Sequence, residues 1–425
     1  MKAASETFLL IFFMLAAFIV SGQEHTLPVD RIKLNDTALG KHYSPQTDKN
    51  GQLDIIDVGI SIGKSFLKKV PKRGVDTGKA DVGKAHISLL PGVGYSLQTG
   101  FAAVIQGNCG FYTSNTPDAN LSSIESSISY TQLQQILIPI QANLWSKNNA
   151  YNLQTDWRFL KFPQMTYGIG GYTSLQEGYF IDYSNIRMYT TLYKAVAPDV
   201  YVGAGYDFDY LWDVHEVNPP PGVVTDFQKY GISNTDVASA PTIDFLYDTR
   251  RNSINPAGGS FVNLVYRPNL TLIGSSENWQ SLVLDMRKYI PLPFGSKNIL
   301  ALWSYDWLTV DGHPPYVLLP NTGGDPYGNT GRGFTEGRFR GRDMLYAESE
   351  YRFGITKNGF LGGVVFVNGQ SFSEETNDQF ARIYAGYGAG LRIKFNKFSK
   401  TNICLDYAFG SDGSKGVFIN LGEVF

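Results

Sequence analysis

From about residue 85 to residue 425 the sequence repeats one pattern, in which apolar and polar side chains alternate along a segment that ends in a turn or a polar loop. The stretch ARIYAGYGAGLRIKF, residues 381–395, is typical. Its odd positions hold alanine, isoleucine, tyrosine, leucine and phenylalanine, while its even positions include arginine, glycine and lysine. Because successive side chains of a β-strand point to opposite faces, each such segment predicts a strand with one apolar and one polar face.

Strands of this kind, with a polar face suited to a wet interior, are typical of a transmembrane β-barrel. A soluble β-sandwich alternates as well, but its polar face usually mixes many lysines, glutamates and threonines. Here glycine, tyrosine and phenylalanine number 45, 26 and 27, and only 17% of residues are charged. The charges that we expect to face the lumen include Asp285, Arg287, Arg382, Arg392, Lys394 and Asp406.

We predict an all-β fold, a membrane barrel of about 16 antiparallel strands, and the even count places both chain ends in the periplasm. The turns at 247–260 and 292–298 then lie on the periplasmic side, and the longer loops at 162–179, 212–235 and 311–340 lie outside. The predicted strands are near residues 86–95, 98–112, 120–132, 135–147, 150–161, 180–195, 198–212, 236–249, 258–272, 276–291, 296–310, 341–354, 359–370, 380–395, 399–410 and 415–425.

The first 22 residues predict a secretory signal peptide. Lys2 precedes a short apolar core from Phe8 to Val20, which small residues follow. This core is shorter than the roughly 20 apolar residues that a spanning helix needs. No cysteine lies near residue 22, so a lipoprotein is not indicated either. We therefore expect residues 23–84 to form a periplasmic segment and residues 85–425 to form the barrel.

Within the periplasmic segment, residues 53–70 predict a short amphipathic helix that lies on the membrane or against the barrel rim. A short strand is the alternative, because Val58, Ile60 and Ile62 also alternate with polar residues. The apolar face of the helix would include Ile55, Ile56, Ile62, Phe66 and Leu67.

Several other functions find no support in the sequence. The net charge of −2 offers no basic surface for nucleic acid. Cys109 and Cys404 lack metal-ligand spacing, and we expect them to be unpaired thiols. Histidine occurs at five positions that form no catalytic or metal-binding pattern, so we predict no enzyme, no metal and no cofactor. These positions are His25, His42, His86, His215 and His313.

Residues 331–353 read GRGFTEGRFRGRDMLYAESEYRF, so an arginine–glycine loop runs directly into an alternating strand. This motif resembles that of the BamA/TamA-type outer-membrane barrels of the bacterial surface antigen superfamily. The segments at 248–267, 91–100, 388–395 and 405–410 also resemble strand and turn segments of this family. The resemblance implies a re-entrant loop between the eleventh and twelfth strands, with an arginine–glycine–aromatic tip that folds back into the lumen.

The resemblance also implies roles for individual residues. Arg332 would be the guanidinium at the loop tip, flanked by Gly331, Gly333 and Phe334. Glu350, together with Glu348, would be its partner on the barrel wall, because the planar arginine fork pairs well with carboxylates. Where the family usually has an acid in the next strand, this chain has Asn368, which brings no charge. The motif could also simply brace a loop that plugs the lumen.

The C-terminal segment VFINLGEVF ends the last predicted strand on an aromatic residue. Its alternation resembles the signal that outer-membrane proteins present to their assembly machinery, and Ile419, Leu421 and Phe425 would form that signal. Glu423 alone breaks the alternation.

Residues 23–84 show no pattern of the POTRA modules that precede the barrel in family members that handle proteins, so the resemblance is to a barrel-only member. It implies a protein that assists protein or lipid insertion or translocation at the outer membrane of a Gram-negative bacterium. The alternative is a passive channel or a small-solute transporter. The expected partners are phospholipid, lipopolysaccharide, the assembly machinery that inserts this chain as its client, unfolded barrel proteins and a second copy in a homodimer.

Overall fold

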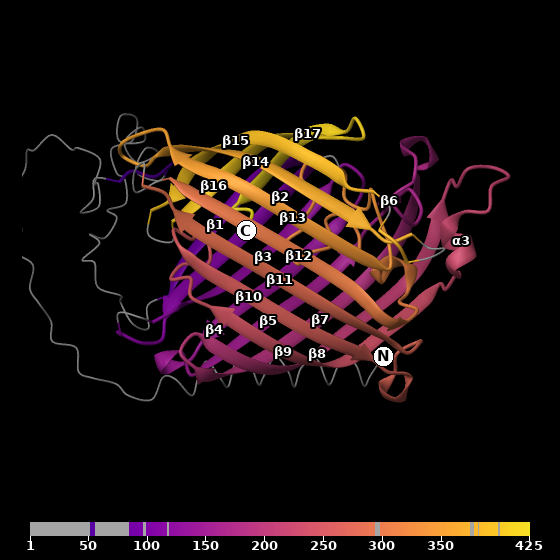
Figure 1. Ribbon diagram of the computed structural model, residues 1–425, viewed down its shortest axis with the longest axis horizontal. Helices are drawn as coiled ribbons and strands as arrows, with labels where there is room; N and C mark the ends of the chain where they lie inside the picture. The colour runs from indigo at the N-terminus through magenta and orange to yellow at the C-terminus, as the bar shows by residue number, and fades with distance from the viewer. Residues whose placement is uncertain are drawn as a thin grey trace, which may run out of the picture. The chain divides into compact units, whose positions relative to one another are not determined.

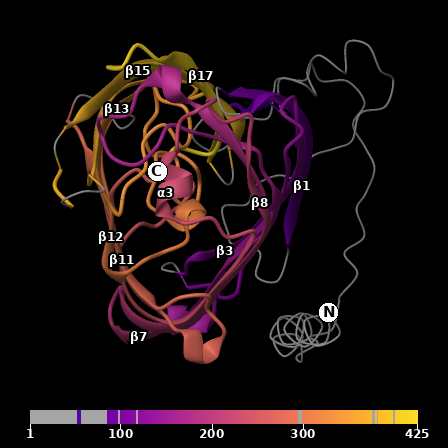
Figure 2. The ribbon, with the colours of Figure 1, turned by 90° about the vertical axis from the view of Figure 1, so that its right-hand side faces the viewer.

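The computed structural model describes residues 52–55, 85–96, 99–116, 119–293, 298–374, 378–380, 382–397 and 400–425, all within one compact unit, Pro45–Phe425. In this unit 17 strands form a single sheet. Long tilted strands make up the wall in Figure 1, and they form a ring around inner segments of the chain in Figure 2. The predicted all-β barrel is therefore confirmed.

Each strand pairs in antiparallel fashion with the next along the chain, except that β5 and β6 both pair with β7. The strands are β1 (His86–Ser96), β2 (Gly100–Tyr112), β3 (Leu121–Thr131), β4 (Ile136–Trp145), β5 (Tyr151–Lys161), β6 (Gln164–Thr166), β7 (Tyr179–Ala197), β8 (Val200–Val217), β9 (Thr235–Asp248), β10 (Gly259–Asn269), β11 (Trp279–Pro291), β12 (Ile299–Gly312), β13 (Asp343–Gly354), β14 (Leu361–Phe372), β15 (Tyr384–Asn396), β16 (Thr401–Gly410) and β17 (Lys415–Leu421).

Sixteen of these strands correspond to the sixteen predicted ones, and the short β6 is additional. The first and last strands, β1 and β17, approach each other where the sheet ends meet. Among the described residues, no backbone ladder joins these two strands, whereas consecutive strands elsewhere in the wall are paired along much of their length. The ring therefore has a weakly paired seam.

Helical segments are few and short among the described residues. They are α3 (Asp226–Tyr230), η1 (Lys147–Asn149), η2 (Leu175–Glu177), η3 (Thr271–Ile273) and η4 (Tyr316–Leu318). No helix in the described part of the chain is long and apolar enough to span a bilayer.

The alternation of side chains places apolar residues outside and charges inside, as predicted. On β11, Asp285 is buried toward the lumen while Met286 is exposed on the outer face. Lys288 and Asp306 depart from this rule, because they share the outer face with Met286 and Leu302. The outer face is therefore not uniformly apolar.

Asp306 has a local structural reason to face outward. The ladder between β12 and β13 is interrupted between the pairs Ser304–Ala347 and Trp307–Met344. At this interruption the Ser304 hydroxyl donates to the carbonyl of Tyr346 at 3.1 Å, and the backbone N–H of Tyr346 donates to Asp306. The two side chains therefore replace ladder hydrogen bonds that the strands do not make.

Residues 52–55 contact two turns that join strands of the barrel. The Leu53 N–H donates to the carbonyl of Asn358 at 3.2 Å, and the buried Asp54 carboxylate accepts from the Lys397 N–H at 3.0 Å. Ile55 has helical geometry. The other residues named for the predicted amphipathic helix lie outside the described residues; these are Ile56, Ile62, Phe66 and Leu67.

Candidate functional site

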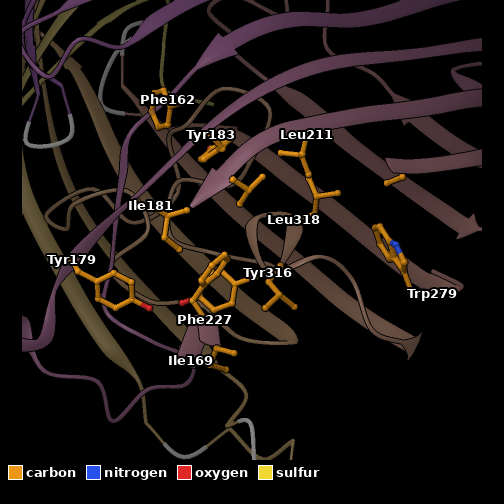
Figure 3. Close-up of a cluster of buried hydrophobic side chains, with 13 residues drawn as sticks. Phe162, Ile169, Tyr179, Ile181, Tyr183, Leu211, Phe227, Trp279, Tyr316 and Leu318 are labelled. Carbon is orange, nitrogen blue, oxygen red and sulfur yellow. The ribbon is translucent and has the colours of Figure 1, made fainter. Parts of the chain in front are cut away.

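The loop between β12 and β13, residues 313–342, turns back into the barrel, as the predicted re-entrant loop requires. Its first part is held by a cluster of buried apolar side chains (Figure 3). Tyr316 and Leu318 of η4 pack there with Phe227 of α3, whose ring lies 5.2 Å from that of Tyr316 in an edge-on arrangement. Burying such side chains stabilises the docked loop by about 1.5–3 kcal/mol each.

The tip of the loop depends on two glycines. Gly331 and Gly333 have φ angles of 80° and 106°, a conformation that other residues rarely adopt. A Cβ atom on Gly333 would also lie 2.6 Å from the carbonyl oxygen of Phe409 on β16. The backbone of the tip therefore turns tightly and lies directly against the wall.

Arg332, between these glycines, points into a buried group of carboxylates. It pairs with Glu348 and Glu350 on β13 and, at 2.6 Å, with Asp406 on β16. Its guanidinium also lies 3.6 Å from the ring centre of Phe366 on β14. The side chain is only 2% exposed, and those of both glutamates are fully buried.

The charge of Arg332 is secured by these partners. Burial alone would lower its pKa, but Glu348, Glu350 and Asp406 together hold the pKa above its ordinary value. Arg332 therefore remains a cation, which joins the loop to strands β13 and β16 at once.

Asn368 on β14 also contacts the loop tip, although in a different way from the predicted one. Its side-chain amide donates to the backbone carbonyl of Arg332 at 2.9 Å, so it holds the backbone rather than the guanidinium. Asp406 was predicted only as a lumenal charge. Its inward position in β16 was visible in the sequence, but nothing there indicated which loop residue would reach it.

Further arginines extend the cluster. Arg352 pairs with Glu350 at 2.7 Å, and Arg392 pairs with Asp406 at 2.5 Å and with Glu423 at 2.8 Å. Three guanidinium groups thus face four carboxylates. We call this set the Arg332 cluster: Arg332, Arg352, Arg392, Glu348, Glu350, Asp406 and Glu423.

The C-terminal residues join the same cluster, which corrects the predicted last strand. β17 ends at Leu421 and does not continue to Phe425. Gly422 has a φ of 97°, which turns the chain so that Glu423 meets Arg392. The ring of Phe425 then stacks on Trp303 inside the barrel at 5.0 Å. Glu423 breaks the alternation because it belongs to this inward turn.

The family model of the Omp85 superfamily domain matches residues 145–425. The chain belongs to the Omp85 superfamily. The family predicted from the loop motif is therefore confirmed. A comparison with curated proteins gave no match.

The Omp85 barrel is also similar in fold to solved structures. BamA from Haemophilus ducreyi lacking POTRA domains 1–3 is 14% identical, with a TM-score of 0.53 over 80% of this chain and 70% of that one. CdiB from Acinetobacter baumannii is 12% identical, with a TM-score of 0.52 over 80% and 60%. CdiB from Escherichia coli is 9% identical, with a TM-score of 0.50 over 86% and 69%.

Two other arginines fasten the loop of this Omp85 barrel elsewhere on the wall. Arg340 is 1% exposed and donates to the Tyr316 carbonyl at 2.7 Å and to Gln164 of β6 at 3.0 Å. Arg338 pairs with Asp412, between β16 and β17, at 2.7 Å. No role for either arginine was predicted, although the segment GRFRGR places arginines at every second position.

The remaining predicted site residues of the Omp85 barrel are distributed as follows. Phe334 is buried against Phe339, with ring centres 5.7 Å apart. Ile419 and Leu421 lie in β17, and no side-chain contact of either with the loop is present among the described residues. Cys404 is buried and Cys109 is partly buried, and both are free. Within the described residues, no three His, Cys, Asp or Glu side chains could hold a metal ion.

Glu336 makes the docking of the loop sensitive to pH. It accepts a hydrogen bond from Gln164 at 3.0 Å, and burial together with the nearby Asp325 raises its pKa from 4.5 to about 7. A raised pKa means that docking favours the protonated form. The contribution is therefore complete below about pH 4.5 and is lost as pH rises through about 7.

We expect the purified barrel in planar bilayers to show more frequent current openings at about pH 8 than at about pH 5.5. Glu336→Gln, which stays neutral, is expected to remove most of this difference. A pH dependence that is unchanged in Glu336→Gln would assign the effect to another group.

Proposed function

We propose that this Omp85 barrel assists the insertion or translocation of protein or lipid at the outer membrane of a Gram-negative bacterium, without POTRA modules in residues 23–84. The observation that carries this proposal is the lumenal position of the Arg332 loop. A guanidinium held by three buried carboxylates fastens the loop inside the barrel. A loop fastened inside the lumen in this way does not suit a wide passive pore.

The seam between β1 and β17 gives the proposed activity a location. Strand pairing along the rest of the wall is extensive, whereas the described residues of these two strands make no ladder with each other. Unpaired strand edges can accept another strand, as edge strands generally do. An unfolded barrel protein is therefore the proposed client, with phospholipid and lipopolysaccharide as its surroundings.

The first experiment measures folding of a second barrel protein. We expect lipid vesicles that contain the mature chain to accelerate the folding of an added unfolded barrel protein, by about tenfold over empty vesicles. A second control uses vesicles that contain an unrelated barrel at the same density. Equal folding rates in the vesicles with the mature chain and in those with the unrelated barrel would contradict the proposal.

The second experiment separates this function from that of a channel. In planar bilayers we expect the wild-type chain to be nearly silent, because its loop lies inside the lumen. A stable, large conductance in the wild type would instead support a passive channel or a small-solute transporter.

A further inference from the structure

The outer wall of the barrel carries a hollow of about 330 Å³ across β10, β11 and β12. This volume is at the lower end of the roughly 300–1,000 Å³ that is usual for small-molecule sites. Phe261, Arg287 and Trp303 point from these strands into the lumen, where the Arg287 guanidinium lies 5.3 Å and 5.1 Å from the two ring centres. The alternate positions, which line the hollow, therefore face outward; they are Ser260, Val262, Met286, Lys288, Leu302 and Ser304.

Lys288 supplies a positive charge at this hollow. Its Cα atom lies opposite Ser260 on one side and Leu302 on the other. Its amine donates to the Ser260 hydroxyl at 2.7 Å, and no salt bridge of Lys288 is present among the described residues. The cation is therefore exposed on the lipid-facing wall, and no acidic residue in the described part of the chain pairs with it.

The depth of Lys288 limits what could bind it. It lies three residues before the end of β11 at Pro291, on the side of the barrel that the strand count assigns to the periplasm. Lysines near the ends of membrane segments extend their amines to the level of the lipid headgroups. Next to the amine, Val262, Met286 and Leu302 present an apolar surface.

A glycerophospholipid of the inner leaflet combines the two features that this arrangement needs. Its phosphate is an anion that can accept hydrogen bonds from the lysine amine and from a serine hydroxyl. Its acyl chain can lie in the apolar part of the hollow. A free phosphate ion matches only the first feature, and a lipid without a headgroup matches only the second.

We propose that Lys288, with Ser260 and the hollow beside it, binds the phosphate and one acyl chain of an inner-leaflet glycerophospholipid. This proposal depends on the location in the outer membrane, but not on any insertion activity. A lipid held here would lie directly behind Trp303 and Phe425, which stack on the lumenal side of the same strands.

The test uses the mature chain purified in a neutral detergent and native mass spectrometry with added phosphatidylglycerol. We expect the wild type to retain one phosphatidylglycerol and Lys288→Gln to reduce the bound fraction about tenfold. Leu302→Trp, which fills the hollow but keeps the charge, is expected to reduce it as well. Heat-modifiable migration on gels shows whether each variant is folded.

Lys194 provides the matched control. It is an exposed lysine three residues before the end of β7 at Ala197, and it lies opposite the exposed Val202 on the outer wall. Lys194→Gln is expected to retain phosphatidylglycerol as the wild type does. If Lys194→Gln loses as much lipid as Lys288→Gln, or if Lys288→Gln loses none, the proposed site is wrong.

Two further ligands distinguish the source of the phosphate. Diacylglycerol with the same acyl chains is expected to be released, because it lacks the phosphate. Inorganic phosphate is expected neither to be retained nor to compete. Retention of diacylglycerol would reduce the site to an apolar groove, and competition by inorganic phosphate would make it a site for the free ion; either result contradicts the proposal.

Discussion

Arg332→Ala is expected to release the loop from the barrel wall and to lower the free energy of unfolding by about 3–5 kcal/mol, the usual cost of removing one partner from a buried ion pair. The loss is large because Glu348, Glu350 and Asp406 would remain buried beside one another without the cation that joins them. Urea unfolding in lipid vesicles measures the free energy. Current recordings in planar bilayers should change from near silence to noisy opening.

Trypsin added to folded barrels provides a second measurement of loop release. Arg338 and Arg340 are 2% and 1% exposed in the docked loop and should resist cleavage there. Once the loop leaves the wall, both become accessible. Arg342→Ala is the control, because Arg342 pairs at 3.3 Å with the largely exposed Asp378, and such surface pairs contribute little.

Glu348, Glu350 and Asp406 differ in whether a second cation would still neutralise them after Arg332 is removed. This difference gives a second prediction for Arg332→Ala. Glu350 keeps Arg352, and Asp406 keeps Arg392, when Arg332 is removed. For Glu348 the structure shows no other cation within salt-bridge distance among the described residues. Adding Glu348→Gln to Arg332→Ala should therefore recover part of the lost stability, about 0.5–3 kcal/mol, whereas adding Glu350→Gln should recover none.

An equal recovery from both second substitutions would contradict this account. It would mean that the carboxylates share their charge across the whole cluster and that no single one is left uncompensated.

The wall of this barrel could be predicted from the sequence because its determinant is local. Each strand carries its own alternation, so residues 381–395 predict the two faces of β15 without knowledge of any neighbour. The short β6 was missed because three residues cannot display an alternation. The end of β17 was placed too late because Phe425 falls on the same odd positions as Ile419 and Leu421, while the turn at Gly422 depends on partners inside the barrel.

The candidate site could be predicted only in part, and for a related reason. The loop tip and its partners on β13 lie close together in the sequence, and the resemblance to a known family connects Arg332 with Glu348 and Glu350. Asp406 lies 74 positions away from Arg332. Whether a loop reaches it depends on the path of the loop across the lumen, which no local pattern encodes.

The loop tip also lies against β15 at Gly386, where the strand carries no side chain. Gly386→Ala is expected to disrupt this contact between the tip and the wall. Gly386 lies between Asn368 on β14 and Gly410 on β16, on the lumenal face. A Cβ atom there would collide with the carbonyl oxygen of Arg332 and lie 2.7 Å from the amide oxygen of Asn368. Both belong to the contact that holds the tip, so the added methyl group must move the loop.

We expect Gly386→Ala to cost about 1–3 kcal/mol, as overpacking usually does, and to make the loop accessible to trypsin. Gly369→Ala on β14 is the matched control, because its Cβ would face outward at an ordinary 3.5 Å from Ile383. Replacing glycine in a strand without a clash commonly stabilises by about 0.4–1 kcal/mol, so the two variants should shift stability in opposite directions. Equal behaviour of the two alanine variants would mean that the loop tip is not seated on β15.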